Sequence, residues 1–245
     1  MGLTITAIVC AYNEARYLPA CLFSLLSQTR PPDEILVINN ASTDETAAQA
    51  ERVPGVRVID EPEKGLVIAR ETARRHAKGD VLVYTDADCR APVFWLERLE
   101  RRFLRGQALV AVTGPYRFYD WDWTGRTLIR LYDVAVAPPT HFLVHDALGM
   151  GAILYGGNFA VRRSALEQIG GFDRRIEFHG EDTNLGRRLT PLGSVDICSE
   201  CWVWTSARRY RAMGKRQVFK LYVRNFWSEI LRHRPADVQH LDVRG

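Results

Sequence analysis

The sequence lacks an apolar run long enough to cross a bilayer. Among its 245 residues, the longest stretch without a charged residue or a histidine runs from Ala147 to Val161. That is shorter than the roughly 20 residues that a transmembrane helix needs. The first ten residues carry no basic leader, so we expect no signal peptide. With 47% hydrophobic and 25% charged residues, the composition is that of a globular domain, which excludes fibrous and disordered classes.

Cysteine is scarce, and its count is odd. The five cysteines are residues 10, 21, 89, 198 and 201. An odd number in a chain of this length is untypical of a disulfide framework and favours a reducing compartment. Cys198 and Cys201 form a single Cys-x-x-Cys with no second pair, which we interpret as two incidental cysteines at a strand edge. The sequence therefore predicts a cytoplasmic protein.

Positive charge is scarce in the first part of the chain and concentrated at its end. Residues 1–100 hold 11 Lys and Arg against 15 Asp and Glu, and residues 101–200 hold 12 against 11. Residues 201–245 hold 10 against 3, a net charge of +7 within a total of +4. A basic C-terminal segment favours an anionic partner there, such as phosphate, lipid headgroups or nucleic acid.

Apolar, β-branched runs alternate with helical periodicity over residues 1–105. This order predicts an α/β fold with a mostly parallel central sheet and helices on both faces. Ligands of such sheets bind beyond the carboxyl ends of the strands, where three polar segments follow predicted strands: Ala11–Glu14, Asn39–Asp44 and Asp86–Asp88. The predicted strands are Leu3–Cys10, Glu34–Ile38, Val56–Ile59 and Val81–Thr85, and the predicted helices are Glu14–Ser27, Asn40–Glu51, Gly65–Lys78 and Val93–Arg105.

The second half of the chain has a less regular pattern. We expect strands over Leu109–Thr113 and Gly156–Val161, and a helix over Arg126–Val136 that Pro138 and Pro139 bring to an end. Further helices are expected over Ser164–Ile169, Glu181–Leu189 and Lys215–Arg232. No linker or repeat marks a clear domain boundary.

Two acidic segments are candidates for chemistry. Asp86 and Asp88 follow a buried strand and are separated by one residue, so both carboxylates can face one Mg²⁺ or Mn²⁺ ion. Turn formation is the alternative, because Asp is common after strands. Glu181 and Asp182 begin a predicted helix, where they either complement the helix dipole or supply a general base.

Seven ordered segments together resemble the family 2 glycosyltransferases of GT-A fold. They cover roughly residues 4–190 and are Thr6–Glu14, Pro32–Glu45, Lys64–Arg70, Gly79–Cys89, Gly156–Arg163, Gly170–Asp173 and Gly180–Leu189. The resemblance implies a GT-A domain over residues 1–213, with a nucleotide-binding half (1–106) and an acceptor-binding half (107–213). A basic amphipathic helix and tail would follow over residues 214–245.

The resemblance also implies an activity. The chain would transfer a sugar from a UDP- or GDP-linked donor to an acceptor hydroxyl with inversion, in the synthesis of cell-envelope glycans or glycolipids. Asp182, beside Glu181, would be the catalytic base, and Asp86 and Asp88 would hold Mn²⁺ or Mg²⁺. Donor binding would fall to Ala11, Tyr12, Glu14, Asn39, Asp44, Arg70, Asp86, Ala87, Gly156, Gly157, Asn158, Arg208 and Arg209.

The sequence departs from the family pattern at three points. Asn39 stands where an Asp commonly binds the uracil N3–H. No His occurs over residues 205–211, where many relatives place a metal ligand, so Arg208 or Arg209 is a candidate for binding the diphosphate instead. The Gln-x-x-Arg-Trp motif of processive members is absent after residue 190, so synthesis of a long polymer is not expected.

The Lys215–Arg232 segment is basic and rich in aromatic residues. We expect its aromatic side to pack on the core, with contact to the inner face of an anionic membrane as the alternative. Arg126–Tyr155 is expected to be an acceptor-side lid for a carbohydrate or lipid-linked acceptor.

Two other functions compete with sugar transfer. One is a catalytically silent nucleotide-sugar binder. The other is a sugar nucleotidyltransferase, although such enzymes need a glycine-rich phosphate loop after the first strand, where this chain has Ala-Tyr-Asn-Glu. Nucleic acid is not an expected partner, because no recognised binding motif accompanies the basic tail.

Overall fold

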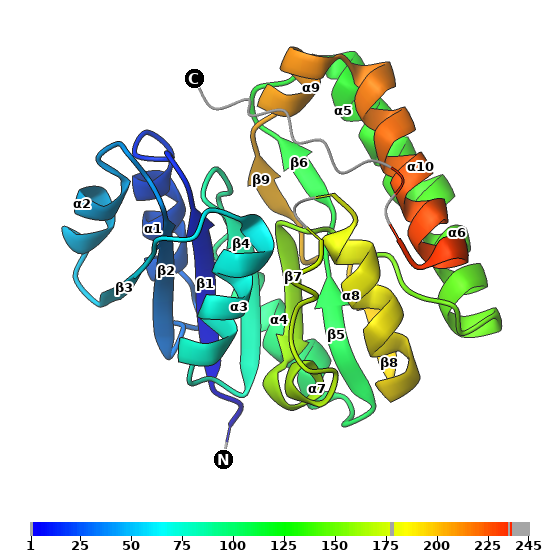
Figure 1. The fold of residues 1–245 in the computed structure, drawn as a ribbon, viewed down its shortest axis with the longest axis horizontal. Helices are drawn as coiled ribbons and strands as arrows, with labels where there is room; N and C mark the ends of the chain where they lie inside the picture. The colour runs from blue at the N-terminus through cyan, green and yellow to red at the C-terminus, as the bar shows by residue number, and fades with distance from the viewer. Residues whose placement is uncertain (1, 177–178, 235, 237–245) are drawn as a thin grey trace.

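A seven-stranded sheet organises the computed structural model, which describes residues 2–176, 179–234 and 236. Its strand order is β3-β2-β1-β4-β7-β5-β8 (Figure 1). Every neighbouring pair is parallel except those of β7, which runs antiparallel to β4 and β5. This confirms the mostly parallel sheet. The strands are β1 (Ile5–Ala11), β2 (Glu34–Asn40), β3 (Val56–Glu61), β4 (Val81–Asp86), β5 (Leu109–Thr113), β7 (Asn158–Arg162) and β8 (Ser194–Ile197).

Helices cover both faces of the sheet because side chains alternate along each strand. In β1, Ile5, Ala7 and Val9 pack in one buried cluster with α1 (Leu18–Leu26) and α4 (Trp95–Leu104), while Ile8 packs in a second cluster with α3 and α8. Figure 1 accordingly has α3 and α8 in front of the sheet and α1 and α4 behind it. The remaining bounds are α2 (Thr46–Glu51), α3 (Leu66–His76), α7 (Arg163–Gln168), α8 (Glu181–Leu189) and η3 (Thr190–Leu192).

The strand order reverses between β1 and β4. The chain adds β2 and β3 on one side of β1 and then places β4 on the other side. Neighbouring strands whose following segments diverge in this way leave a crevice at their carboxyl ends. Glu14 follows β1, and Asp86 and Asp88 lie at the end of β4, so the acidic side chains are delivered to that crevice. A small parallel sheet of β6 (Tyr116–Phe118) and β9 (Val203–Thr205) lies beyond the same edge (Figure 1).

The segment from residue 123 to residue 147 is continuously helical. It comprises α5 (Trp123–Leu131), the π-helical turn η1 (Tyr132–Val136), α6 (Ala137–His141) and a second π-helical turn η2 (Phe142–Ala147). The predicted break at Pro138 and Pro139 is therefore wrong. Both prolines lie in the first turn of α6. Proline is tolerated at that position, because the N–H groups of a first turn make no α-helical hydrogen bond within the helix.

The C-terminal helix α10 (Lys215–Arg232) has the predicted bounds but not the predicted packing. Glu229, fully buried, accepts hydrogen bonds from Asn184 Nδ2 at 2.9 Å and Arg187 Nε at 3.2 Å, which ties α10 to α8. Phe219 stays 55% exposed and Trp227 38% exposed, so most of the aromatic side does not pack on the core. The proposed division at residues 213 and 214 falls between α9 (Arg208–Met213) and α10, and the tail beyond residue 236 lies outside the described residues.

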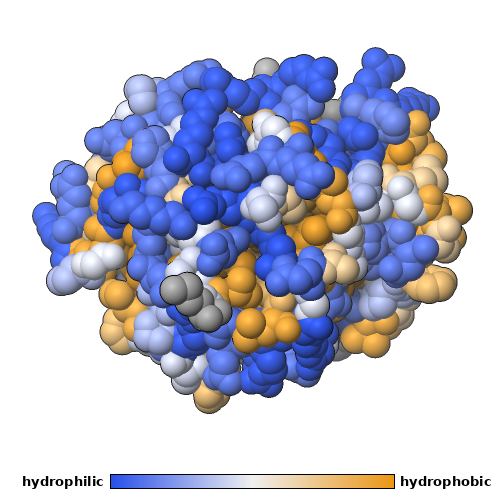
Figure 2. Space-filling model, turned by 90° about the horizontal axis from the view of Figure 1, so that it is seen from below, coloured by the Kyte–Doolittle hydropathy of each residue, from blue (hydrophilic) through white to orange (hydrophobic). Residues whose placement is uncertain are grey.

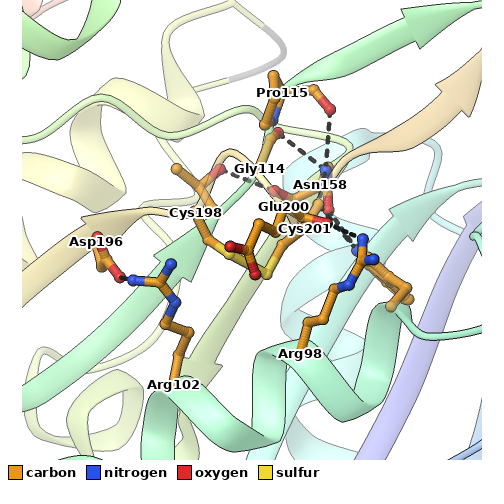
Figure 3. The surroundings of a disulfide bond; sticks show 11 residues. Arg98, Arg102, Gly114, Pro115, Asn158, Asp196, Cys198, Glu200 and Cys201 are labelled. Atoms are coloured by element: carbon orange, nitrogen blue, oxygen red, sulfur yellow. Dashed lines mark hydrogen bonds and ion pairs between the residues drawn. A yellow bond between two sulfur atoms is a disulfide. The ribbon is translucent and has the colours of Figure 1, made fainter.

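Cys198 and Cys201 form a disulfide, so the interpretation as incidental strand-edge cysteines was wrong (Figure 3). They lie in the turn between β8 and β9, which brings their Cα atoms to 5.3 Å, within the range that a disulfide requires. The turn is also anchored to α4, because Arg98 Nη1 donates to the Glu200 carbonyl at 2.6 Å. The other three cysteines, Cys10, Cys21 and Cys89, are free.

Candidate active site

Asp86, Asp88 and Cys89 bring possible ligand atoms within 4.8 Å of one another at the end of β4. Ala87, between the two acids, is buried. Carboxylate oxygens suit Mg²⁺ and Mn²⁺. Burial raises the pKa of the Cys89 thiol well above its usual range, so it remains a weak ligand for such ions. Burial also raises the pKa of Asp88 to about 7, while the nearby Arg208 charge opposes that shift.

Arg208, the first residue of α9, joins this site to the end of β1. Its Nε lies 3.1 Å from Asp88 Oδ2. Its Nη1 donates to Glu14 Oε2 at 2.9 Å, and its Nη2 bonds the other Glu14 oxygen. Both carboxylates are more than nine-tenths buried. The structure therefore distinguishes the two candidate arginines, because Arg209 turns instead to Tyr222 and donates to its hydroxyl at 2.9 Å.

A glycine pair before β7 lies between the two acidic segments. A Cβ atom on Gly157 would overlap the Asp86 carboxylate, and one on Gly156 would lie 3.1 Å from Glu181 Oε1 and 3.3 Å from Asp182 Oδ2. The Gly157 N–H donates to the hydroxyl of Tyr116 at 2.5 Å. Only glycine fits between Asp86 and Tyr116, so this loop sets the spacing between the two carboxylate pairs.

Glu181 and Asp182 begin α8 and have different partners. Gly180 precedes them in the left-handed conformation that glycine adopts without strain. Arg70, 3% exposed, bonds the Glu181 carboxylate and donates to the Gly156 carbonyl at 2.6 Å. Arg70 therefore lies behind the site and holds the base region to the glycine loop.

Asp182 retains an oxygen that faces the glycine loop. Its Oδ1 accepts from the Thr183 N–H at 2.7 Å. Its Oδ2 is the Asp182 atom that lies closest to Gly156. Burial, followed by the charge of Glu181, raises the pKa of Asp182 to about 7. A carboxyl group with such a pKa can accept a proton near neutral pH.

The end of β2 carries an acceptor atom that no group of the described residues satisfies. Asn39 Nδ2 donates to Asp60 Oδ1 at 2.8 Å, which fixes the orientation of the amide, and Asn39 Oδ1 is buried without a hydrogen-bond partner. An N–H donor of a ligand would satisfy that oxygen. Asp60 was missed in the sequence, although its position directly after a predicted strand next to Asn39 was a usable signal.

The loops after β1 and β2 hold each other in place. Asp44 accepts from the Ala15 N–H at 3.1 Å and from the Thr46 N–H at 3.0 Å, so its carboxylate braces the two loops. Lys64 lies 3.9 Å from the centre of the Tyr12 ring and brings a cation to the crevice. Ala11 is the buried last residue of β1.

Asn158 lies behind the site rather than in it. Its side chain is 1% exposed, donates to the Cys201 carbonyl at 2.8 Å and accepts from Trp95 Nε1 at 3.1 Å (Figure 3). The disulfide turn thus supports the strand that follows the glycine pair. Tyr116, which the sequence did not single out, contacts the pair directly.

Comparison with known proteins places the chain in a family. The model of the family described as "Glycosyl transferase family 2" matches residues 6–170. The chain belongs to this family and is a glycosyltransferase. It is 27% identical over 221 residues to glycosyltransferase AglE of Haloferax volcanii, covering 87% of this chain and 70% of that protein. It is 32% identical over 118 residues to glycosyltransferase GlyA of Streptococcus pneumoniae, covering 46% of this chain and 17% of that protein.

Solved structures have the same GT-A fold. The mannosyltransferase PcManGT of Pyrobaculum calidifontis, in complex with GDP-Man and Mn²⁺, superposes with a TM-score of 0.66 at 24% identity, over 95% of this chain and 64% of that one. Glucosyl-3-phosphoglycerate synthase of Mycobacterium tuberculosis, with Mn²⁺, UDP and phosphoglyceric acid, gives 0.66 at 20% identity, over 94% and 78%. The chain thus spans less than two thirds of the first of these structures.

Proposed function

We propose that the protein is an inverting, Mn²⁺- or Mg²⁺-dependent and non-processive transferase that moves a sugar from a UDP- or GDP-linked donor to an acceptor hydroxyl. The observation that carries this proposal is the glycine pair, which has Asp86 against one residue and Asp182 against the other. A donor sugar lying along this loop would have its diphosphate towards Asp86 and Asp88 and its acceptor side towards Asp182.

Inversion follows from the roles that the two carboxylate pairs can take. Asp182 Oδ2 would accept the proton of the acceptor hydroxyl while the acceptor oxygen bonds to the anomeric carbon. The bond from that carbon to the diphosphate breaks, and the diphosphate leaves with the electron pair. A divalent ion bound by Asp86 and Asp88 would neutralise charge on the diphosphate. Glu181 is engaged by Arg70, so a second carboxylate is not available there as a nucleophile.

Asn39 supports a base that carries an N–H donor. Its buried Oδ1 has no hydrogen-bond partner among residues 2–176, 179–234 and 236, and both uracil and guanine present a ring N–H at their pairing edge. This position favours UDP- or GDP-linked donors over cytidine ones, whose pairing edge presents an acceptor there.

The test uses methanol in water as the acceptor, because a methyl glycoside keeps its anomeric configuration whereas a free sugar mutarotates. The protein is incubated with Mn²⁺ and UDP-glucose, UDP-galactose, UDP-N-acetylglucosamine or GDP-mannose, and nucleoside diphosphate release and the anomer of the methyl glycoside are measured. We expect slow release from one donor, with the anomeric configuration inverted. Asp182→Asn should abolish release, whereas the surface control Asp196→Asn should not. Retention of configuration would overturn the inverting mechanism.

The alternatives give different results in the same assay. A silent binder would be stabilised by a donor in thermal denaturation but would release nothing. A nucleotidyltransferase would instead form pyrophosphate from a sugar 1-phosphate and a nucleoside triphosphate.

We further propose that α10 contacts an anionic membrane and that the acceptor is lipid-linked. Phe219, Val223, Trp227 and Leu231 form an exposed row four residues apart, beside the exposed row Arg216, Lys220 and Arg224. The single acidic residue of α10, Glu229, is buried. Apolar and basic side chains without an acid between them are typical of helices that lie in a membrane interface.

The neighbouring helical segment adds to this surface. Leu128, Leu131 and Val134 are at least 58% exposed, and Phe226 of α10 packs against the cluster that contains Ala137 of α6. Figure 2 has hydrophobic surface on its right-hand side, the side on which Figure 1 draws α6 and α10. In the described parts of the chain, no helix is long and apolar enough to span a membrane, so contact would be peripheral.

Sedimentation with vesicles tests this contact. Binding to phosphatidylcholine vesicles should be weak and should rise when anionic phosphatidylglycerol is added. Phe219→Ser combined with Trp227→Ser should abolish it, whereas Phe94→Ser, at the residue that precedes α4, should not. Equal binding by both variants would overturn the proposal. A cytoplasmic location at the inner membrane face remains a prediction. The odd cysteine count no longer supports it, because Cys198 and Cys201 form a disulfide.

A further inference from the structure

One arginine balances two buried carboxylates where a metal and a diphosphate would bind. Arg208 bonds Glu14 through both terminal nitrogens and Asp88 through Nε. Thr205 Oγ1 donates to the other Asp88 oxygen at 3.3 Å. Both oxygens of Asp88 are therefore engaged by protein groups in this structure, and Asp86 supplies a third acid nearby.

A divalent ion bound to Asp88 Oδ2 would share that oxygen with the guanidinium of Arg208. Two cations that share one carboxylate oxygen repel each other, so each weakens the binding of the other. If Arg208 leaves Asp88, its charge needs a second anion besides Glu14. A donor diphosphate offers that anion in the bidentate geometry that arginine prefers.

The surroundings of Arg208 permit such an exchange. Its side chain is 19% exposed, against 3% for Arg70. It starts a helix of six residues that ends at Met213, just before Gly214, and its guanidinium lies 5.0 Å from the centre of the Tyr17 ring, a flat surface along which it can turn.

We propose that Arg208 couples metal binding to nucleotide binding: it holds Asp88 and Glu14 in the unliganded protein and transfers to the diphosphate when a divalent ion takes Asp88. The ion and the nucleoside diphosphate then bind well only together. This inference rests on the proposed function, and it assigns Arg208 as a positioning residue for the metal site.

Titration with Mn²⁺, followed by the electron paramagnetic resonance signal of the free ion, tests the coupling without turnover. In the unaltered protein, Mn²⁺ alone should bind weakly, and UDP or GDP should tighten it at least about tenfold, a normal size for coupled sites. Arg208→Gln should bind Mn²⁺ alone about tenfold more tightly. Its coupling to UDP or GDP should fall below about threefold.

Arg211→Gln is the matched control, because Arg211 lies on the same helix but pairs with Asp120. It should behave like the unaltered protein. Thermal denaturation checks folding, and if Arg208→Gln does not fold, Arg208→Met provides the same test, since it also removes the fixed charge and adds no metal ligand. Unchanged Mn²⁺ affinity in the variants, or an equal effect of Arg211→Gln, would overturn the coupling.

Failure of the inference can be told from failure of the proposed function. If Mn²⁺ and UDP or GDP bind together in the unaltered protein and Asp88→Asn abolishes this, the metal site stands whatever Arg208 does. If no combination binds, the proposed function itself fails.

Discussion

The two carboxylate pairs of the site are built alike but held differently. In each, an arginine bonds one acid: Arg70 bonds Glu181, and Arg208 bonds Asp88. Arg70 is almost fully buried and also holds the Gly156 carbonyl, whereas Arg208 is partly exposed and starts a short helix. The comparison separates a fixed counter-charge, which belongs to the fold, from an exchangeable one, which a ligand can replace.

The largest effect should come from Asp182, the acid of its pair that Arg70 does not bond. Asp182→Asn should lower kcat about 10²- to 10⁴-fold, the usual contribution of a general base. Burial raises the Asp182 pKa to about 7, so the folded state is destabilised as pH rises from about 4, where an exposed Asp ionises, to 7. The variant should therefore melt a few degrees higher at pH 8 and no higher at pH 4. A lower melting temperature at pH 8 would contradict the raised pKa.

Removing the fixed counter-charge, Arg70, should lower the free energy of unfolding more than removing the exchangeable one, Arg208. Arg70→Gln leaves Glu181 buried and unpaired, and such losses cost about 3–5 kcal/mol. Arg208→Gln should cost less, because its side chain is more exposed. Urea unfolding measures both. Mn²⁺ with UDP or GDP should restore stability to the Arg208 variant alone; equal recovery by both would remove the distinction between the two arginines.

Substitutions of Gly156 and Gly157 test the difference between the two carboxylate pairs through ligand binding. Gly157→Ala places a methyl group on Asp86 and should weaken Mn²⁺ and nucleotide binding about tenfold, the size of an overpacking penalty. Gly156→Ala meets the Glu181 and Asp182 oxygens only at 3.1 and 3.3 Å and should affect kcat more than binding. Calorimetric titration with UDP or GDP and Mn²⁺ distinguishes the two. Equal loss of binding would show that the loop does not separate the two acidic pairs.

The smallest effect should appear as a pH dependence. With Mn²⁺ and donor saturating, kcat should rise about tenfold between pH 6 and pH 8 as Asp182 loses its proton, following its pKa of about 7. A flat profile would mean that another group accepts the proton.

The sequence allowed prediction of the sheet and of most site positions, but not of their partners. Continuous apolar runs marked β1, β2 and β4, and the acids that follow them lie at one edge because of the topology. The Arg70–Glu181 and Arg208–Glu14 contacts join residues that are 111 and 194 positions apart, and no local sequence pattern encodes them. The π turns around α6 depend on packing in the same way, so the prolines there were misread as a break. The disulfide depended on the turn after β8, whose shape the spacing of two cysteines does not fix.

The reversed direction of β7 has a consequence for how new specificities can arise on this scaffold. Every parallel strand leaves the sheet at the edge that carries the site, whereas β7 enters the sheet there. Of the segment that enters, residues 151–155 are buried and Gly157 has no room for a side chain, but residues 148–150 are exposed or half-buried. Those three residues can therefore change in length or composition without altering the helix that follows the strand. The turn from Arg162 into α7, at the opposite edge, offers no such access. We expect exchange of residues 148–150 between relatives to be a simple route to a different acceptor.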